Sequence, residues 1–421
     1  MEKLHSLTGM MDLIFQKDNQ SDLSNKIFET EKRLIKIFES YSLKEIRTPS
    51  LESENLFKRS VGDSSDIVNK ELYTFKDKND KNISLRPEGT AGVARSIIEK
   101  KLDNDFHRLW YLGPMWRYER PQKGRFRQFY QAGVELLGYP QGLSELEMIS
   151  MIISINSEMD IHDAKIKINH LGDKKAKNNF SIALKDYLLP YLSEIDEKEI
   201  ERLQKNPLRI LDSKNTETQE ILKNAPSILD FVSSDSKHLL DKIKNTFPDE
   251  SIEIDSKLVR GLDYYTGFIF EAISEKLGAQ NSYLGGGRYD HLFEDLGGKK
   301  LPAIGMAIGI ERLADIARDF KNKTTLLSFI IISDKIEQKA YKIAHDLRSV
   351  NKNIVIEVQL SDSSIKSKLR RANKDNATYA IIVGEEEIES NTILLKSLKE
   401  ENSDQKKLTV EEIKSFLKSI N

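Results

Sequence analysis

Hydrophobic residues recur at helical spacing near the start of the chain, between positions 21 and 41. They are Leu23, Ile27, Leu34, Ile35 and Phe38. Because apolar side chains three and four positions apart share one face of a helix, this pattern predicts a helix. The residues from 44 to 48 favour a strand, and Pro49 would end it because proline has no backbone N–H for a sheet ladder.

Short β-favouring runs then dominate residues 71 to 138, with turn-like or charged segments between them. The runs are LYTF, ISLR, LWYLG and FYQAGVELL, and comparable ones return later as LVRGLDYYTGFIFEAI and SYLGGGRYD. Strands that follow one another without regular intervening helices favour an antiparallel sheet. We therefore predict one antiparallel sheet that resumes at residue 258 and is followed by a helix over AIGIERLADIARDF.

Two other regions follow different patterns. Residues 173 to 245 are rich in Lys, Asp, Leu and Ser at helical periodicity, which predicts a helical insertion. After Arg318 strands alternate with helices, from LLSFIII to the last helix TVEEIKSFLKSI, and such alternation indicates a separate α/β domain. The predicted organisation is an α+β domain of residues 1–325 that contains the insertion, a charged linker at 321–323, and an α/β domain of residues 326–421.

Composition and charge argue against several classes of protein but do not indicate a particular function. The 65 Lys and Arg nearly balance the 67 Asp and Glu, so any site for a polyanion must be local. The absence of cysteine, and of any H-x-x-x-H pair among the seven histidines, argues against disulfides and a structural zinc, and we expect no metal site. No segment has the pattern of a signal peptide or approaches the roughly 20 apolar residues of a membrane span, so we expect a cytoplasmic protein without membrane contact.

The densest cluster of positive charge lies in a predicted hairpin between Trp110 and Gly138. Its cations are Arg117, Arg120, Lys123, Arg125 and Arg127. Guanidinium groups match phosphate oxygens in pairs, so this hairpin could bind a polyphosphate, with Phe129 stacked on a base and Glu135 fixing a polar substrate. On charge alone, a solvated basic hairpin is the more ordinary interpretation.

Four further segments combine chemistry with unusual backbone patterns. In LRPEGTAG, residues 85–92, the Glu88 carboxylate and the Thr90 hydroxyl can both accept from an ammonium group, although a charged turn is an equal alternative. LVRGLDYYTG, residues 258–267, by itself predicts a strand with partly buried tyrosines. GGGRYD, residues 285–290, is not a phosphate-binding loop motif and by itself indicates a bulge or tight turn. In AIGMAIGIERL, residues 303–313, small residues allow close approach of a ligand to the backbone, and a buried arginine there would need an anion.

Together these segments carry a specific resemblance. WRYERPQKGRFRQFYQAGVE, residues 116–135, resembles the second signature motif of class II aminoacyl-tRNA synthetases in its bacterial histidyl form. LVRGLDYYTG resembles a segment particular to the histidyl-tRNA synthetase family, and the other three segments fit that family, although His291 stands where it has glycine. The resemblance covers nearly the whole chain. It implies a class II antiparallel-sheet catalytic domain with a helical insertion, followed by an anticodon-binding domain.

The resemblance also implies an activity and the residues that perform it. The implied enzyme is a ligase that activates L-histidine with ATP and then transfers histidine to the 3′ end of tRNA(His). Catalytic roles fall to Arg117 and Arg260. Histidine binding falls to Glu88, Gly89, Thr90, Gln131, Glu135, Tyr264, Tyr265 and Tyr289. ATP binding falls to Arg117, Arg125, Phe129 and Arg312, and contact with the tRNA acceptor end to Arg120 and Gln122.

Partners follow from the same resemblance. Magnesium is expected with ATP, and no tightly bound cofactor is expected. Because the first helix and strand resemble the first class II motif, a homodimer is expected. In the C-terminal domain Lys366, Arg370 and Lys374 form one helical stripe that could lie along an RNA backbone, although a solvated face is the more ordinary interpretation of such a run.

Two rival functions remain open from sequence. One is a regulatory paralogue that resembles the catalytic domain but serves as a subunit of ATP phosphoribosyltransferase. The other is a synthetase for another amino acid, such as threonine, proline or glycine. The intact set of histidine and ATP residues and the presence of the C-terminal domain oppose the first, and LVRGLDYYTG opposes the second.

Overall fold

The computed structural model describes residues 3–15, 22–62, 65–122, 124–278, 280–320, 324–399 and 405–420. The chain divides into two compact units, Met1–Ile14 with Lys26–Arg318, and Phe15–Asn25 with Asp319–Asn421. Lys123 of the basic hairpin and the predicted linker at 321–323 lie outside the described residues. No helix within the described ranges is long and apolar enough to cross a membrane.

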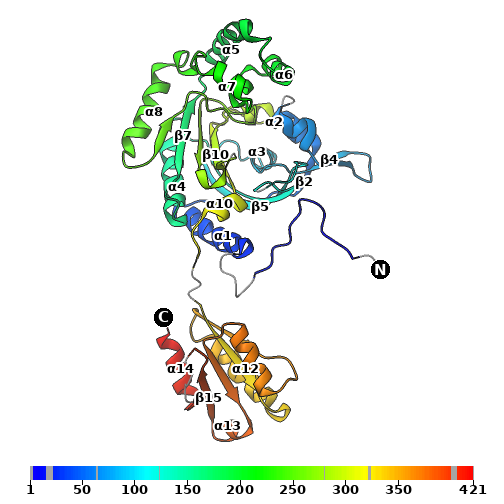
Figure 1. Cartoon of the computed structure of the whole chain (residues 1–421), viewed down its shortest axis with the longest axis vertical. Coiled ribbons are helices and arrows are strands. Elements are labelled where there is room, and N and C mark those ends of the chain that lie inside the picture. Colours follow the sequence, from blue (N-terminus) through cyan, green and yellow to red (C-terminus); the bar gives the residue numbers. More distant parts are fainter. Residues whose placement is uncertain are drawn as a thin grey trace. The chain divides into compact units, whose positions relative to one another are not determined.

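The larger unit is built on one broad sheet (Figure 1). Among the described residues eight strands form it, in the order β1-β5-β6-β11-β10-β9-β7-β8. Neighbouring strands are antiparallel except for the pairs β1 with β5 and β7 with β8, which are parallel. The bounds in that order are Lys44–Glu45, His107–Trp116, Gln128–Leu137, Ala303–Gly309, Ser282–Arg288, Phe268–Ile273, Lys165–His170 and Ile252–Ile254. The prediction of a mainly antiparallel sheet is thus confirmed.

Three parts of the strand prediction are wrong. The runs between 72 and 85 do not join the broad sheet, because β3 (Thr74–Lys76) and β4 (Asn82–Leu85) pair with β2 (Leu51–Ser53) in a small separate antiparallel sheet. The first strand ends at Glu45 instead of reaching Pro49. One reason is that the carbonyl of Thr48 accepts from Arg86 Nη1 at 2.9 Å, so a side chain takes the place of a strand partner.

The third correction concerns LVRGLDYYTG. Residues 258–267, all of them described, form neither helix nor strand, and β9 begins only at Phe268. In a strand, neighbouring side chains point to opposite faces, whereas Tyr264 and Tyr265 are both buried beside one pocket. Gly267 also has a φ of +65°, which a continuous strand does not accommodate.

Helices and short turns complete this part of the chain. They are α1 (Leu23–Ser40), α2 (Glu54–Val61), η1 (Ile67–Glu71), α3 (Thr90–Glu99), α4 (Leu143–Met159), η5 (Glu275–Leu277), α9 (Leu292–Asp295) and α10 (Ile310–Ile316). The predicted first helix is confirmed as α1, where Ile27, Leu34 and Phe38 are fully buried. The strand β11 runs directly into α10, as the pattern of small residues followed by a helix predicts.

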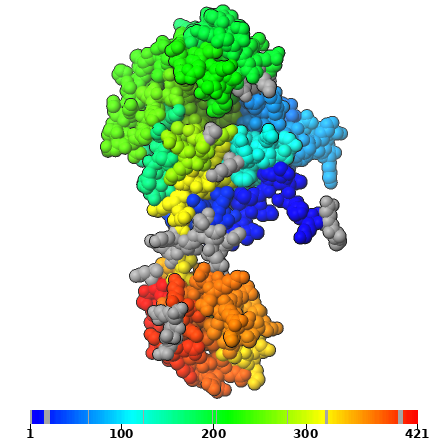
Figure 2. Space-filling model, in the orientation of Figure 1, coloured from blue at the N-terminus to red at the C-terminus, as the bar shows by residue number. Residues whose placement is uncertain are grey.

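A run of helices interrupts the sheet between β7 and β8. We call residues 174–246 the insertion; it contains α5 (Lys174–Leu188), η2 (Leu189–Tyr191), α6 (Glu197–Lys205), η3 (Pro207–Asp212), α7 (Thr216–Leu222), η4 (Ile228–Asp230) and α8 (Ser234–Thr246). Side chains of Asp173, Asn215 and Ser233 cap the starts of α5, α7 and α8. Figure 1 shows α5, α6 and α7 together at one end of the larger unit and α8 beside β7, and Figure 2 shows the same residues, in green, on the surface.

The smaller unit carries its own sheet. Within its described residues five strands lie in the order β13-β12-β14-β15-β16, the first three parallel and the last two antiparallel. The strands are β12 (Thr325–Ile331), β13 (Ile354–Val358), β14 (Tyr379–Val383), β15 (Thr392–Ser397) and β16 (Lys406–Thr409). The helices are η6 (Asp334–Ile336), α11 (Glu337–Arg348), α12 (Ile365–Lys374), α13 (Glu385–Glu389) and α14 (Val410–Ser419). The predicted alternation of strand and helix is confirmed, but α13, β15 and β16 were not predicted.

Candidate active site

A pocket of about 360 Å³ opens above the middle strands of the broad sheet. Its walls come from the β5–β6 hairpin, β10, the start of α10 and the loop 258–267. The predicted residues that line it are Glu88, Thr90, Arg117, Arg125, Phe129, Gln131, Arg260, Tyr264, Tyr265 and Arg312. The fold therefore gathers side chains from four separate sequence segments into one cavity.

Glu135, a predicted histidine-binding residue, lies in the core beside this pocket and is not among the described residues that line it. It is 0% exposed, and its carboxylate accepts from the Thr90 hydroxyl at 2.7 Å and from the Tyr289 hydroxyl. Burial raises the pKa of Glu135 to about 8, although both hydroxyl bonds lower it. Glu135 and Tyr289 therefore stand directly behind Thr90. A Cβ at Gly305 would overlap Glu135 Oε2, so this position of β11 requires glycine.

Glu88 and Gly89 shape the neighbouring wall. The Glu88 carboxylate accepts the backbone N–H of Thr90 at 2.6 Å and of Ala91 at 2.9 Å, so it caps the start of α3. Burial raises its pKa, and the two backbone bonds oppose that shift. A Cβ at Gly89 would run into the ring of Tyr111, whose hydroxyl donates to Gln131 Oε1 at 3.3 Å. Glycine is thus required for close packing and lines no part of the cavity itself.

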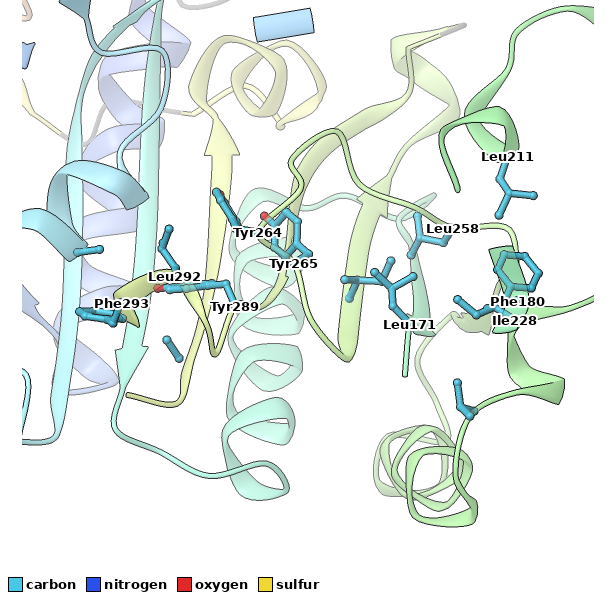
Figure 3. Packing of buried hydrophobic residues seen from close by; sticks show 14 of the residues in the cluster. Leu171, Phe180, Leu211, Ile228, Leu258, Tyr264, Tyr265, Tyr289, Leu292 and Phe293 are labelled. Carbon is cyan, nitrogen blue, oxygen red and sulfur yellow. The ribbon is translucent and has the colours of Figure 1, made fainter. Parts of the chain in front are cut away.

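Three tyrosines continue this end of the pocket. The rings of Tyr264 and Tyr265 lie 4.7 Å apart between centroids, and those of Tyr264 and Tyr289 lie 5.6 Å apart (Figure 3). Burial raises the pKa of all three hydroxyls, so they remain neutral donors. Tyr264 and Tyr265 line this end of the cavity, whereas Tyr289 and Glu135 lie behind its lining residues.

Arg260 lies between this end and the arginines of the hairpin. Its Nη1 donates to Glu271 Oε1 at 2.8 Å, while its buried Nε has no hydrogen-bond partner among the described residues. Burial acts to lower its pKa, but Glu271 and the tyrosines raise it overall, so the guanidinium stays charged. A Cβ at Gly285 would overlap this guanidinium. The sequence did not predict Glu271 as a partner of Arg260, because nothing distinguishes this glutamate in FEAI from an ordinary acidic residue on a strand.

The opposite end of the pocket is rich in arginine. Arg117 Nε donates to the Pro87 carbonyl at 3.0 Å, and its guanidinium lies over the Phe129 ring at 5.2 Å from the centroid. Glu119 pairs with Arg125 at 3.1 Å and also lies 3.7 Å from Arg117. The Glu119 carboxylate thus lies close to both Arg117 and Arg125.

Arg312, at the start of α10, is held entirely by neutral oxygens in the structure. It donates to the carbonyl of Gly124 at 3.0 Å, to the carbonyl of Ser282 at 2.7 Å and to Gln280 Oε1 at 3.3 Å. Burial lowers its pKa and Arg125 lowers it further. Arg312 thus lines the cavity, and none of these three bonds goes to a carboxylate. This fits the prediction that a buried arginine at this position needs an anion.

Other residues depart from the sequence-based expectations. Arg120 and Gln122 are exposed in the hairpin loop and are not among the residues that line the pocket. His291 has a φ of −99°, so the position does not require the glycine found in the family. The pocket also receives Asp212 and Lys214 from the end of η3, which sequence reasoning did not single out.

The comparisons with known proteins agree with this geometry. A family model described as Histidyl-tRNA synthetase matches residues 17–313, and one described as Anticodon binding domain matches residues 327–420. The chain belongs to the histidyl-tRNA synthetase family. It has the mixed helix and sheet fold of that family, with a catalytic domain followed by an anticodon-binding domain.

Individual members of the family match the chain over its length. The histidine–tRNA ligase of Prochlorococcus marinus is 43% identical over 410 residues and covers 96% of this chain and 95% of its own. That of Francisella philomiragia is 39% identical over 430 residues, with full coverage of both. The apo structure of S. aureus histidyl-tRNA synthetase matches with a TM-score of 0.77, 31% identity and 100% coverage of both chains.

One more distant structural match is to a protein whose description includes the rival function, a regulatory subunit of ATP phosphoribosyltransferase. A Bacillus halodurans protein described as an ATP phosphoribosyltransferase regulatory subunit/histidyl-tRNA synthetase matches with a TM-score of 0.64 at 19% identity, covering 91% of this chain. At that identity the match shows the shared fold alone.

Proposed function

We propose that this chain activates L-histidine with ATP to give histidyl-adenylate and then transfers histidine to the 3′ end of tRNA(His). The single observation that carries this proposal is the pocket itself, which has Thr90 and two tyrosines in front of the buried Glu135 carboxyl group at one end and three arginines at the other. Family membership supports the same activity, because the relatives are named as histidine–tRNA ligases.

Histidine is recognised at the carboxyl end of the pocket. Glu135 accepts an imidazole N–H, and Thr90 and Tyr289 keep its carboxylate oriented. A buried carboxylate that must find a donor rejects apolar isosteres, which would leave it unpaired. The Glu88 carboxylate and the Thr90 hydroxyl oxygen use their remaining lone pairs to accept from the ammonium group. The amide group of Gln131 and the rings and hydroxyls of Tyr264 and Tyr265 complete the pocket for the side chain.

ATP is bound at the arginine end. Phe129 stacks on the adenine, and Arg117 contacts the α-phosphate that will be attacked. Arg125 and Arg312 contact other phosphate oxygens, since both line this end of the cavity. Mg²⁺ enters with ATP as part of the substrate, and the carboxylates that line this end are Glu119, Glu271 and Glu311.

The reaction consists of two displacements. In the first, a histidine carboxylate oxygen forms a bond to the α-phosphorus while the bond to the pyrophosphate breaks. In the second, the tRNA hydroxyl attacks the activated carbonyl carbon, AMP leaves, and the hydroxyl proton is released. Arg260 lies beside the tyrosines and beside Glu271, where it can contact both the histidine carboxylate and the α-phosphate as negative charge builds.

Exposed residues outside the pocket suit contact with tRNA and with a second copy of the chain. The exposed side chains of Lys366, Arg370 and Lys374 share one face of α12, which suits contact with the RNA backbone near the anticodon. Leu51 and Phe75 of the small sheet are 46% and 47% exposed, and we propose that a second copy of the chain covers them in a homodimer. Arg120 and Gln122 contact the acceptor end of tRNA, in the cytoplasm where tRNA is charged.

Charging assays test this function directly. Purified tRNA is incubated with the enzyme, ATP and each amino acid in turn, and aminoacylated tRNA is measured. Histidine should be the preferred substrate, and tRNA(His) the preferred acceptor. Preference for threonine, proline or glycine, or no charging at all by a folded enzyme, would contradict the proposal.

A further inference from the structure

The loop that carries Arg260, Tyr264 and Tyr265 has no sheet neighbour of its own. Residues 258–267 are all described and take part in no strand pairing. A buried backbone that lies outside a sheet must still find hydrogen-bond partners. In this loop, two backbone carbonyls, those of Gly261 and Tyr265, accept from side chains of the insertion. The insertion is therefore in direct contact with the segment on which histidine recognition depends.

Two side chains near η3 hold the turn that follows Arg260. Arg209 Nη2 donates to the Gly261 carbonyl at 2.7 Å and to Asp263 Oδ1 at 3.0 Å. Asn206 Nδ2 donates to the same Asp263 oxygen at 3.1 Å. The side chains of Arg209 and Asp263 are 20% and 26% exposed, and these bonds lie at the surface. One guanidinium thus fixes a backbone carbonyl and a side chain of the loop at the same time.

A second cation of the insertion holds the other side of the loop. Lys177, on α5, donates from Nζ to the Tyr265 carbonyl at 2.5 Å. Burial lowers the pKa of Lys177 to about 8, and Asp263 acts to raise it. Because both the charged and the neutral amine carry N–H groups, this bond does not depend on the charge of Lys177. The bond fixes the backbone between the paired tyrosines and β9.

Apolar packing joins the same two parts. Leu258, at the start of the loop, is 7% exposed and belongs to one hydrophobic cluster with Phe180 and Leu211 of the insertion. Figure 3 shows Leu258 near these residues, with Tyr264 and Tyr265 further along the same cluster. The loop therefore meets the insertion through a continuous core as well as through directed hydrogen bonds.

We infer that the insertion is a positioning element for the histidine pocket, with Arg209 and Lys177 as positioning residues that hold loop 258–267 in its binding-competent form. Neither residue lines the pocket, so neither is expected to touch substrate. When the competent form of a site is only partly populated, the apparent dissociation constant rises by the inverse of that population. Loosening the loop should therefore weaken histidine binding, while saturating histidine should restore the ordered loop.

The coupling must also act in the reverse direction. If a docked insertion favours histidine binding, bound histidine must favour a docked insertion by the same free energy. Amide protons of loop 258–267 and of η3 should consequently exchange more slowly when histidine is bound. ATP alone should protect these amides less. The arginines proposed to bind ATP lie on the β5–β6 hairpin and on α10, not on the loop or on η3.

The test compares Arg209→Met, Lys177→Met and their double variant with Lys185→Met, which removes an exposed cation from the same helix α5. Histidine and ATP are varied separately in pyrophosphate exchange, and hydrogen exchange is followed with and without histidine. Each single variant should raise the histidine KM about tenfold, with the ATP KM and kcat changed by less than about threefold, as expected when one hydrogen bond to a backbone carbonyl of the loop is lost. Arg209→Lys should recover part of the loss, and Lys185→Met should behave as wild type.

The outcomes separate this inference from the proposed function on which it rests. A fall in kcat with both KM values unchanged, an equal rise in both KM values, or the same effect from Lys185→Met would overturn the positioning role. If the wild-type enzyme failed to use histidine, the proposed function would fall instead. In that case the exchange of the loop amides still decides whether Arg209 and Lys177 hold the loop, because faster exchange in their variants is expected without any substrate.

Discussion

At the histidine end of the pocket, Glu135 is fully buried and already accepts hydrogen bonds from Thr90 and Tyr289. At the nucleotide end, Arg125 keeps 38% of its side chain exposed and pairs with Glu119. The first arrangement is fixed by hydrogen bonds within the protein. The second must change partners, because phosphate oxygens and Glu119 compete for the same guanidinium groups.

This difference follows from what each end must recognise. Discrimination among amino acids depends on a few buried hydrogen bonds whose geometry is fixed in advance, since a mobile carboxylate would accept alternative donors. A polyphosphate presents many equivalent oxygens, so exposed arginines can bind it in several ways without loss of specificity. Substitutions should therefore affect the two substrates separately, except at Arg260, which lies between the two ends.

Arg260→Lys is expected to have the largest effect. A lysine ammonium offers a mobile point charge and cannot hydrogen-bond the histidine carboxylate and the α-phosphate as one planar group. The kcat of pyrophosphate exchange should fall on the order of 10²- to 10³-fold, while the KM values for histidine and ATP stay within about an order of magnitude. Steady-state pyrophosphate exchange measures all three quantities.

The second half-reaction supplies the control for Arg260. Transfer from preformed histidyl-adenylate to tRNA should suffer less in the same variant, because that step no longer forms the bond to phosphorus. Near-normal pyrophosphate exchange by a folded Arg260→Lys enzyme would show that this arginine is structural and that charge development is stabilised elsewhere.

Glu135→Ala should have the next largest effect, and on one substrate only. The substitution removes the acceptor for the imidazole N–H and leaves the hydroxyls of Thr90 and Tyr289 without their partner. The histidine KM should rise about 100-fold, as expected when a buried charged acceptor is lost, whereas the ATP KM should change little. Equal changes in the two KM values would remove the distinction between the two ends.

The sequence predicted the two ends unequally well. Arg117, Arg125 and Phe129 lie close together in one hairpin, so a local pattern and its family resemblance suffice to place them. The residues of the histidine end come from distant segments and are placed by the pairing of β6, β10 and β11. Local patterns also misassigned residues 258–267 as a strand, because alternation along the chain cannot show that the tyrosines turn to the same side.

Some features of the site leave no trace in a single sequence. Arg260 Nη1 donates to Glu271 Oε1 at 2.8 Å, and nothing in the sequence around either residue indicates this pair. The requirement for glycine at 305 depends on the Glu135 carboxylate and the Val134 carbonyl, and a side chain at 285 would displace the Arg260 guanidinium, which comes from another segment. Such requirements arise from tertiary packing, so they cannot be derived from local propensity.

Phe129→Leu tests the nucleotide end with a smaller expected change. Leucine preserves bulk but loses the flat surface on which adenine would stack and over which Arg117 now lies. The ATP KM should rise about tenfold, within the usual range for a lost base–aromatic contact, and the histidine KM should stay near wild type. Phe129→Tyr, which keeps the ring, should bind ATP normally. A larger change for histidine than for ATP would contradict the assignment of the two ends.

The pH dependence of histidine binding provides the smallest and most specific effect. In the empty pocket burial raises the pKa of Glu135 to about 8, so below that pH the group is mostly protonated. Acceptance of an imidazole N–H favours the carboxylate, and binding must then release a proton. The histidine KM should therefore fall as pH rises toward 8 and level off above it, about fivefold between pH 7 and 8 for a single group.

Glu135→Gln separates this titration from that of the substrate. The amide cannot ionise, so in this variant only the histidine groups and the other pocket residues contribute to the pH profile. Subtracting the two profiles of log KM isolates the contribution of Glu135. If wild type and Glu135→Gln give parallel profiles between pH 7 and 9, then Glu135 does not change protonation on binding. Histidine recognition would then rest on the neutral hydroxyls of Thr90 and the tyrosines, and both ends of the pocket would have to adjust to their ligands.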